Sequence, residues 1–320
     1  MKVFVAGATG VLGRALIPQL VARGHDVVGM TRSASKHDLV QNLGARPVVA
    51  DALDPDAVAQ AVAAAEPEVI VHELTALSGT MSIRDARHPE RFPGAIMTNR
   101  LRTEATDHLL AAGRAVGARR FLAQSFGAFR FAQTGGPVLT EDEPLDLKQA
   151  GATQANVEAL LYLERAVTTI TWGEGLALRY GGFYGPGTAI SRAPDAPIAA
   201  PVRKRRFPII GDGGGVLSHI HIDDAAAATA DAVERGRPGV YYIVDDEPAP
   251  VREWLPVLAT ALDAKPPRRI PRWLGRLAAG ETATLMMTEA RGASNAKAKR
   301  EFGWQPRYPS WRLGFKQGLG

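Results

Sequence analysis

Three glycines spaced three residues apart follow an apolar run at residues 3–6 and precede a helical pattern that begins near Arg14. Between a strand and a helix, glycines at this spacing allow a tight turn, close approach of a pyrophosphate, and close packing of helix on strand. The helix start then offers unpaired N–H groups and a positive dipole end to phosphates. A purely structural turn also favours glycine, but the flanking strand and helix favour a dinucleotide site. Its expected contacts are Gly7, Thr9, Gly10, Val11, Leu12 and Gly13.

The residue that follows the second expected strand indicates which dinucleotide binds. Residues 26–30 are typical of a strand, and Arg32 comes directly after it, about twenty residues beyond the glycine turn. An acidic side chain there would bind the free 2′-hydroxyl of NAD, whereas arginine can pair with a 2′-phosphate in bidentate fashion. The alternative is a solvated loop arginine. We therefore expect NADP, with NAD as the second choice.

Two further strand ends are expected at the same edge of a parallel sheet, where ligands of such sheets bind. Residues 45–51 form the third expected strand, and Asp51 and Ala52 follow its apolar part. Asp51 is placed either at the adenine edge or as a cap of the helix that begins near Asp54, and both readings stay open. Residues 69–72 form the fourth strand. The cofactor contacts expected after it are Leu74, Thr75 and Ala76.

Composition limits the classes of protein to consider. The chain has 320 residues, 46% hydrophobic and 22% charged, as in ordinary globular proteins. It contains no cysteine, which excludes disulfides and thiolate chemistry. The net charge of +5 suits an anionic ligand and does not indicate nucleic acid. No apolar stretch reaches membrane-spanning length and the chain starts in a core strand, so we expect a cytoplasmic protein. His219 and His221 lack a third partner, so no metal site is expected.

Strands and helices alternate along the first 180 residues, which predicts an α/β fold with a doubly wound parallel sheet. Beyond residue 180 the alternation breaks. We expect residues 1–180 and 216–247 to form the nucleotide-binding domain. Residues 181–215 and 248–320 are expected to form a smaller C-terminal substrate lobe.

Several motifs in order make the chain resemble the extended short-chain dehydrogenases/reductases of the NAD-dependent epimerase/dehydratase type. These motifs are the glycine turn, Asn99, Ser125, Leu178-Arg179, Tyr184-Gly185-Pro186-Gly187, Gly211-Asp212-Gly213, His221-Ile222-Asp223-Asp224 and residues 297–306. The resemblance implies a Rossmann-type fold, a nicotinamide cofactor whose site includes Asn99, and a small-molecule substrate. It also implies a homodimer through the helices expected at residues 95–116 and 156–167.

The chain departs from this family at the centre of its chemistry. The family uses a serine, an acid/base tyrosine, and a lysine four residues after that tyrosine. Ser125 matches the serine, but alignment on Glu164 places Asn156 and Leu160 at the other two positions. Leucine has neither charge nor donor, and an amide is not a practical acid.

A replacement proton donor must therefore come from another segment. We expect it to be Tyr184, in the glycine-rich loop after the sixth strand, with Tyr180 and His221 as alternatives. Tyr184 could equally be a packing residue. The predicted catalytic residues are thus Ser125 and Tyr184.

The predicted activity is that of an NAD(P)-dependent oxidoreductase, or of an epimerase or dehydratase, acting on a small hydroxyl or carbonyl compound such as a sugar or secondary metabolite. Two alternatives stay open because the acid/base pair is missing. One is a cofactor-binding sensor without turnover. The other is a non-redox isomerase or lyase that keeps the cofactor as a structural element.

Overall fold

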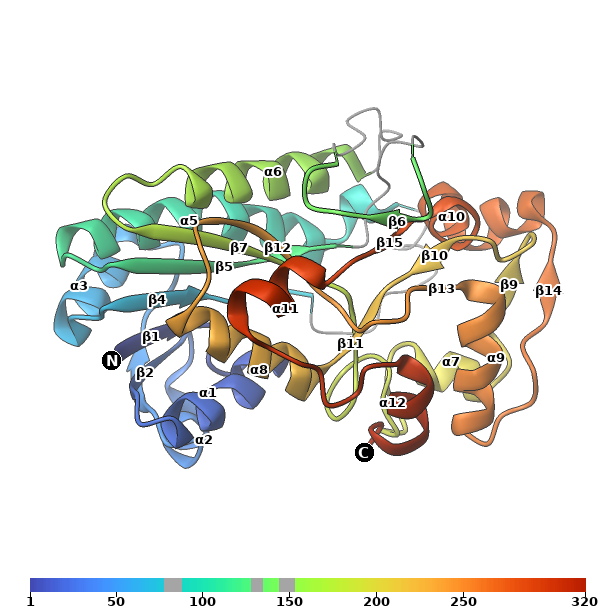
Figure 1. Cartoon of the computed structure of the whole chain (residues 1–320), viewed down its shortest axis with the longest axis horizontal. Helices are drawn as coiled ribbons and strands as arrows, with labels where there is room; N and C mark the ends of the chain where they lie inside the picture. The colour runs from blue at the N-terminus through green and yellow to red at the C-terminus, as the bar shows by residue number, and fades with distance from the viewer. Residues whose placement is uncertain (78–87, 128–134, 144–152) are drawn as a thin grey trace.

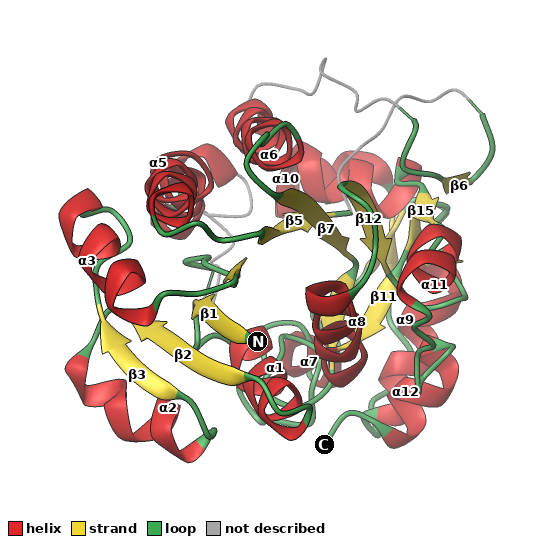
Figure 2. Cartoon of the chain, turned by 60° about the vertical axis from the view of Figure 1, so that its left-hand side comes forward, coloured by secondary structure: helices red, strands yellow, loops and turns green. Residues whose placement is uncertain are grey.

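A twisted parallel sheet of seven strands forms the centre of the protein (Figures 1 and 2). The computed structural model describes residues 1–77, 88–127, 135–143 and 153–320. The spatial order of the strands is β12-β7-β5-β4-β1-β2-β3, and each neighbouring pair is parallel. Their bounds are β1 (Lys2–Ala6), β2 (Asp26–Thr31), β3 (Arg46–Val49), β4 (Val69–His72), β5 (Arg120–Phe126), β7 (Glu174–Tyr180) and β12 (Gly239–Ile243).

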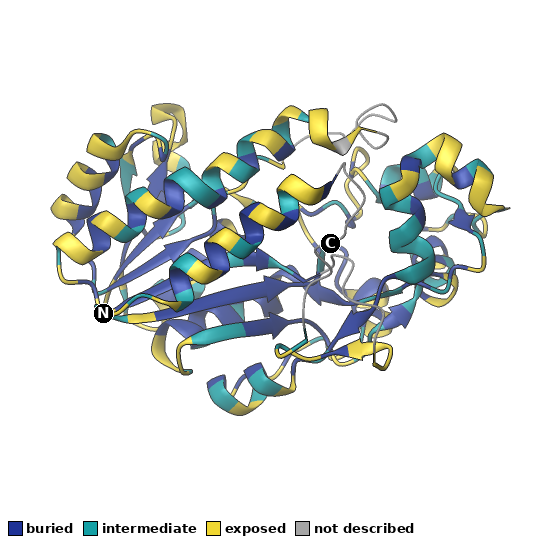
Figure 3. Ribbon diagram, turned by 90° about the horizontal axis from the view of Figure 1, so that it is seen from above, coloured by how far each residue is buried: buried dark blue, intermediate teal, exposed yellow. Residues whose placement is uncertain are grey.

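Helices cover both faces of this sheet (Figure 2). One face carries α3 (Pro55–Ala65), α5 (Pro93–Ala115) and α6 (Gln154–Thr168). The other carries α1 (Val11–Ala22), α2 (His37–Asn42), α8 (Ile222–Glu234) and α11 (Ala296–Phe302). In Figure 3 the strands are buried and the outward faces of the helices above them are exposed. This is the layered α/β arrangement that buries both faces of a parallel sheet.

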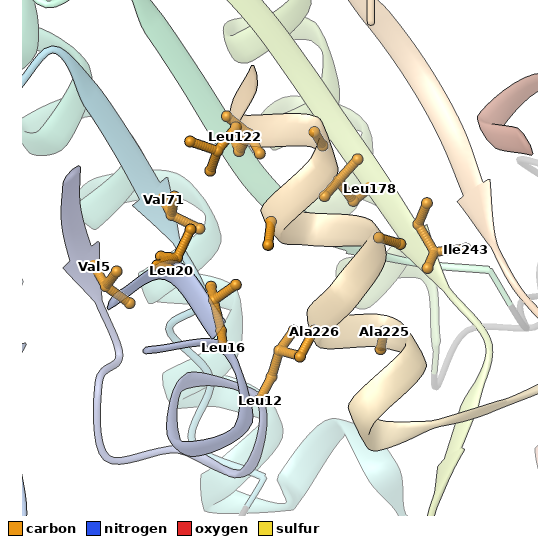
Figure 4. Close-up of a cluster of buried hydrophobic side chains, with 14 of the residues drawn as sticks. Val5, Leu12, Leu16, Leu20, Val71, Leu122, Leu178, Ala225, Ala226 and Ile243 are labelled. Carbon is orange, nitrogen blue, oxygen red and sulfur yellow. The ribbon is translucent and has the colours of Figure 1, made fainter. Parts of the chain in front are cut away.

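Alternation along the strands divides the core into two layers. Val3 and Val5 of β1 pack with α1 and α8, whereas Phe4 and Ala6 point to the side of α3 and α5. Small residues of α8, including Ala226, let that helix lie close beneath the strands (Figure 4). The first layer continues to β12 through Ile243.

The remaining segments extend beyond the carboxyl ends of the strands (Figure 1). They hold a separate hydrophobic core that includes Tyr184, Trp254 and Phe315. The short strands outside the main sheet are β6 (Val138–Leu139), β8 (Gly182–Tyr184), β9 (Ile209–Ile210), β10 (Val216–Leu217), β11 (His219–His221), β13 (Ala249–Pro250), β14 (Arg269–Ile270) and β15 (Gly292–Ala293). Their helices are α7 (Ala199–Arg203), α9 (Val251–Ala261), α10 (Arg272–Glu289) and α12 (Trp311–Gln317).

The predicted fold class is confirmed, with β1 central and β12 returning to the main sheet beside β7. Two details differ from the sequence expectation. The helix α2 was not expected, and the third strand is shorter than residues 45–51. Strands β10 and β11, within the segment 216–247, pair with β13 and β8 outside the main sheet. The division into a nucleotide-binding domain and a substrate lobe stays a prediction.

Candidate functional site

The glycine turn has the shape that a pyrophosphate site needs. Gly7 has φ +101°, and a Cβ there would lie 2.9 Å from the carbonyl group of Glu73. A Cβ on Gly13 would lie 2.3 Å from the carbonyl oxygen of Gly7, so the start of α1 can approach β1 only with glycine. Gly10 caps α1 without a side-chain hydrogen bond, and the first turn has no acidic residue. The residues present therefore fit a phosphate-bearing cofactor, because the first amides of α1 keep their donors.

The structure places the residues predicted for the adenosine end just beyond β2 and β3. Arg32 is exposed, and no hydrogen bond or ion pair of its side chain occurs within the described ranges. The carboxylate of Asp51 accepts a hydrogen bond of 3.0 Å from the backbone of Leu53. Asp54, not Asp51, caps α3, because its carboxylate accepts hydrogen bonds from the backbone N–H groups of Asp56 and Ala57. The capping alternative for Asp51 is therefore wrong, while its adenine contact and that of Arg32 stay predictions.

The residues predicted around β4 lie at the same edge as the glycine turn. Leu74 donates its backbone N–H to Nδ1 of His72 at 3.3 Å, and Ala76 donates to the hydroxyl of Thr98 at 3.0 Å. Thr75 is exposed at this edge. The segment after β4 is therefore held against α5, and its contacts with a cofactor stay predictions. Ala52, predicted to contact the cofactor after β3, is buried.

Ser125 is part of a buried ion-pair cluster at the end of β5. Its hydroxyl donates a hydrogen bond of 2.6 Å to Glu164 of α6. Glu164 also accepts from Nε and Nη2 of Arg179, at 2.8 and 2.7 Å. Because the single proton of Ser125 is directed to Glu164, this placement favours a structural role: the serine helps to hold β5, α6 and β7 together. Its predicted contact with a substrate oxygen stays untested.

Asn156 and Leu160, the residues expected at the positions of the acid/base pair, lie on α6 with Glu164 of this cluster. The side-chain amide of Asn99 on α5 donates to the carboxamide oxygen of Asn156 at 2.8 Å. Leu160, one turn further along α6, is 2% exposed and packs in the interior. Tyr162 points away, as its helical position predicts, and donates to Asp107 at the surface.

Tyr184, the predicted proton donor, is fully buried. Its ring packs edge-on against His221 and Phe315, with centroids 5.2 Å away in both cases. A Cβ on Gly314 would lie only 2.0 Å from its hydroxyl, which therefore faces α12. The hydroxyl has no hydrogen-bond partner in the described part of the chain, and burial raises the pKa of Tyr184 far above 10. This environment argues against proton donation to a substrate.

The two alternative donors also have structural partners. His221 caps α8 by accepting from the backbone of Asp223, and its Nε2 lies 2.8 Å from the carbonyl oxygen of Gly318. The Tyr180 hydroxyl donates to Glu73 at 3.2 Å, and Thr229 lies 2.6 Å from it. Burial raises the pKa of Tyr180 well above its ordinary value. Both side chains are buried.

Two ionisable residues near this edge are buried; the sequence had drawn attention to Glu73 only as a residue at a strand end, and had given Arg102 no role. Glu73 is 5% exposed, and one of its carboxyl oxygens has no partner among the described residues. Burial raises the pKa of Glu73 to about 8. Arg102 of α5 is 7% exposed, and its Nε also lacks a partner in those ranges. The available signal for Arg102 was its spacing, because it lies between Thr98 and Thr106 on the buried face of the helix.

A hollow of about 490 Å³ lies between α5 and α6. Asn99 and Asn156 line it together with exposed side chains such as Tyr162, whereas no residue of the glycine turn does. The hollow therefore borders Asn99 and Asn156 and is separate from the glycine turn, which we call the phosphate cradle.

Two other kinds of site are absent from the described ranges. No group of three or more histidine, aspartate or glutamate side chains there could hold a metal ion. His219, one of the histidines considered, packs edge-on against Trp254. In the same ranges no helix is both long and apolar enough to cross a membrane.

Comparison with known proteins gives the chain close and distant relatives. It is 48% identical over 316 residues to a 3-diazoavenalumate denitrifying reductase from a Streptomyces species, covering 98% of this chain and 99% of the relative. It is 30% identical over 278 residues to a 2-alkyl-3-oxoalkanoate reductase of Stenotrophomonas maltophilia (strain K279a), covering 82% and 76%. Both relatives are named as reductases.

Solved structures with the same fold share less sequence. A human epimerase family protein crystallised with NADPH has a TM-score of 0.75 at 20% identity, with coverage of 100% and 99%. The UDP-glucose 4-epimerase of Thermotoga maritima, crystallised with UDP-glucose, has a TM-score of 0.74 at 20% identity, with coverage of 100% and 97%. The family model described as "NAD dependent epimerase/dehydratase family" matches residues 3–244. The chain is a member of this family, an NAD(P)-dependent enzyme with a Rossmann-type fold.

Proposed function

We propose that this enzyme is an NADPH-dependent reductase that removes a diazo group, as dinitrogen, from an aromatic carboxylate. The relative that is 48% identical along nearly the whole chain is named for reduction and denitrification of a diazo compound. The feature of this chain that supports the proposal is that Asn156 and Leu160 stand at the positions expected for the family's acid/base pair, and neither side chain is an acid.

Reduction of a ketone and reduction of a diazonium ion differ in their need for an acid. Hydride addition to a ketone leaves an alkoxide that must be protonated beside the cofactor. An arenediazonium ion carries a positive charge, so addition of hydride to its terminal nitrogen gives a neutral diazene without any proton donor. The candidate acids in the described part of the chain suit the second case, because Tyr184 is buried and His221 is already bonded to a protein group.

The balance of the reaction is simple. NADPH supplies two electrons and one hydrogen as hydride, and one arenediazonium ion is consumed. The bond between the ring carbon and nitrogen then breaks, its electron pair stays on the ring carbon, and that carbon takes the proton of the diazene or one from water. The products are one arene, one dinitrogen and one NADP⁺. The glycine turn holds the pyrophosphate in this proposal, and Arg32 holds the 2′-phosphate.

The test uses 4-carboxybenzenediazonium as substrate with the purified enzyme and NADPH. We expect NADPH oxidation, dinitrogen and benzoate to appear in a ratio of one to one to one, faster than in a sample without enzyme. A Gly13→Ala variant serves as the second control, because the added methyl collides with the carbonyl of Gly7 and should abolish cofactor binding. NADPH oxidation at the uncatalysed rate would refute the proposal.

A second candidate is reduction of a 3-oxo acid, favoured by the 30% relative. For this function, NADPH oxidation with 3-oxooctanoate as substrate would release no dinitrogen and would give the 3-hydroxy acid. Running both substrates side by side separates the two functions.

We further propose that the enzyme works in the cytoplasm, where NADPH is supplied, and that it forms a homodimer through α5 and α6. The exposed side chains of Ile96 and Tyr162 on those helices support the second point. Light scattering at micromolar concentration tests it, and a monomer would refute it.

A further inference from the structure

The buried side chain of Arg102 is the feature that the proposed function leaves unexplained. It projects from α5, which lies beside α6 above β4 and β5 (Figure 1). Only 7% of the residue is exposed, and no hydrogen bond or ion pair of its side chain occurs in the described part of the protein. A charged group taken out of water without a partner costs several kcal/mol, so such groups are normally paired.

Neighbouring contacts fix where on α5 this arginine lies. Thr98, one turn before it, bonds to the backbone of Ala76, and Thr106, one turn after it, lies 3.1 Å from Nε2 of His72. Residues four apart share one face of a helix, so Arg102 faces the sheet between these two levels. Since His72 pairs in register with Ala123, that level is the end of β5 that carries Ser125.

The charged groups around Arg102 do not neutralise it by direct contact. Glu164 is near enough to interact electrostatically, but it is already held by Arg179 and Ser125. His72 is neutral near pH 7, because burial, with a smaller contribution from the charge of Arg102, lowers the pKa of His72 to about 4. Burial lowers the pKa of Arg102 itself to about 10, so the guanidinium stays charged.

The phosphate groups of the cofactor are not expected to pair with Arg102. The phosphate cradle lies at the end of β1, and Arg32 lies at the end of β2. In the sheet, β4 separates β1 from β5, so the level of Ser125 belongs to the other end of the nucleotide site. The nicotinamide end carries no phosphate, which leaves the substrate as the source of negative charge.

We propose that Arg102 binds the carboxylate of the substrate, pairing with it beside the amide pair Asn99–Asn156. This rests on the proposed function, and both reductase relatives bear names of carboxylate anions. Arg102 lies one turn after Asn99 on α5, and Leu160 one turn after Asn156 on α6, and the Asn99–Asn156 hydrogen bond joins the two helices. The planar fork of the arginine suits a carboxylate in bidentate geometry.

The test measures binding of benzoate and of benzamide to the enzyme saturated with NADP⁺. In the wild type we expect benzoate to bind at least tenfold more tightly than benzamide, the usual scale of a charge-assisted hydrogen bond. Arg102→Met should abolish that difference and Arg102→Lys should keep part of it, with NADP⁺ affinity unchanged in both. Arg100→Met is the matched control, because Arg100 is exposed on the same helix and paired with Glu104; it should behave as the wild type.

Thermal stability separates a binding role from a structural one. Removing a buried cation that has no partner should leave the melting temperature of ligand-free Arg102→Met at or above that of the wild type. A lower melting temperature together with weaker NADP⁺ binding would make Arg102 structural and overturn the proposal, as would an unchanged benzoate preference in Arg102→Met.

The same data keep the two proposals apart. Dinitrogen release without an effect of Arg102→Met on benzoate binding would refute the carboxylate site and leave the diazo reductase standing. Benzoate binding that depends on Arg102, without dinitrogen release, would refute the diazo reductase and leave the carboxylate site standing.

Discussion

The side-chain amide of Asn99 donates a hydrogen bond of 2.8 Å to the carboxamide oxygen of Asn156 and so joins α5 to α6. Asn156 is the residue that the family resemblance places at the position of the acid/base tyrosine. Neither amide releases or takes up a proton near neutral pH. The oxygen of Asn99 has no partner among the described residues and is available as an acceptor. The pair can therefore orient a bound molecule but cannot act as an acid.

Asn156→Ala tests whether this position takes part in proton transfer. Loss of one hydrogen bond should lower the free energy of unfolding by about 1 kcal/mol. Turnover of the diazonium substrate should fall less than tenfold, because the step needs no acid. The measurement is kcat at saturating NADPH together with chemical denaturation, with Gln154→Ala at the exposed start of α6 as control. A loss of a hundredfold or more in a folded variant would assign Asn156 a direct chemical role.

Tyr184→Phe tests the residue that the sequence favoured as proton donor. Its hydroxyl is buried without a partner in the described ranges, so removing it should leave turnover within about threefold and the melting temperature equal or higher. An essential acid would instead lose a hundredfold or more in kcat with NADP affinity unchanged. Tyr162→Phe, which loses only a surface hydrogen bond to Asp107, controls for removal of a tyrosine hydroxyl.

The fold could be predicted from the sequence because its signals are local. The glycine turn, the apolar strands and the amphipathic helices can each be identified from a few consecutive residues. The parallel arrangement of the strands follows from their alternation with helices. The sequence also shows that no tyrosine is followed by lysine four residues later, and counting back from Glu164 predicts Asn156 and Leu160 at the two positions; that alignment stays a prediction.

The site chemistry could not be predicted because it depends on contacts between distant segments. Ser125 matched a motif, but only the structure shows its proton directed to Glu164, 39 residues away in sequence. Tyr184 follows a strand end as a site residue would, yet α12, from the far end of the chain, closes over its hydroxyl. Arg102 belongs to no motif and Glu73 stood out only as a residue at a strand end, because the burial of either charged group is decided by segments distant in sequence.

Arg32→Ala tests the cofactor preference. Arg32 is exposed, so an ion pair with the 2′-phosphate should be worth on the order of 1–2 kcal/mol, a factor of 5–30 in the dissociation constant. We expect NADP to weaken by that factor while NAD is unchanged. The dissociation constants of NADP and NAD are measured by titration of cofactor fluorescence. Arg114→Ala, in the last turn of α5, is the control. Equal affinity of the wild type for NAD and NADP would show that Arg32 does not read the phosphate.

Glu73 should make the stability of the protein depend on pH. It lies directly against the glycine turn, since a Cβ on Gly7 would meet its backbone at 2.9 Å. Burial raises the pKa of Glu73 from 4.5 to about 8, with the hydrogen bond from Tyr180 acting in the opposite direction. Between these values the unfolded chain has lost the proton while the folded protein keeps it. Raising the pH through this window therefore favours unfolding.

Glu73→Gln keeps a polar side chain of the same size that can accept from Tyr180, but it cannot ionise. We expect the melting temperatures of wild type and variant to be similar at pH 5 and that of the wild type to fall progressively below the variant's towards pH 8.5. In the unfolded chain His72 also titrates over part of this range, but it is common to both proteins and cancels in the difference. Glu158→Gln, at an exposed position of α6, should show no such divergence. Parallel curves for wild type and Glu73→Gln would mean that Glu73 is already ionised in the folded protein at pH 5, and hence that water or a cation reaches the base of the glycine turn.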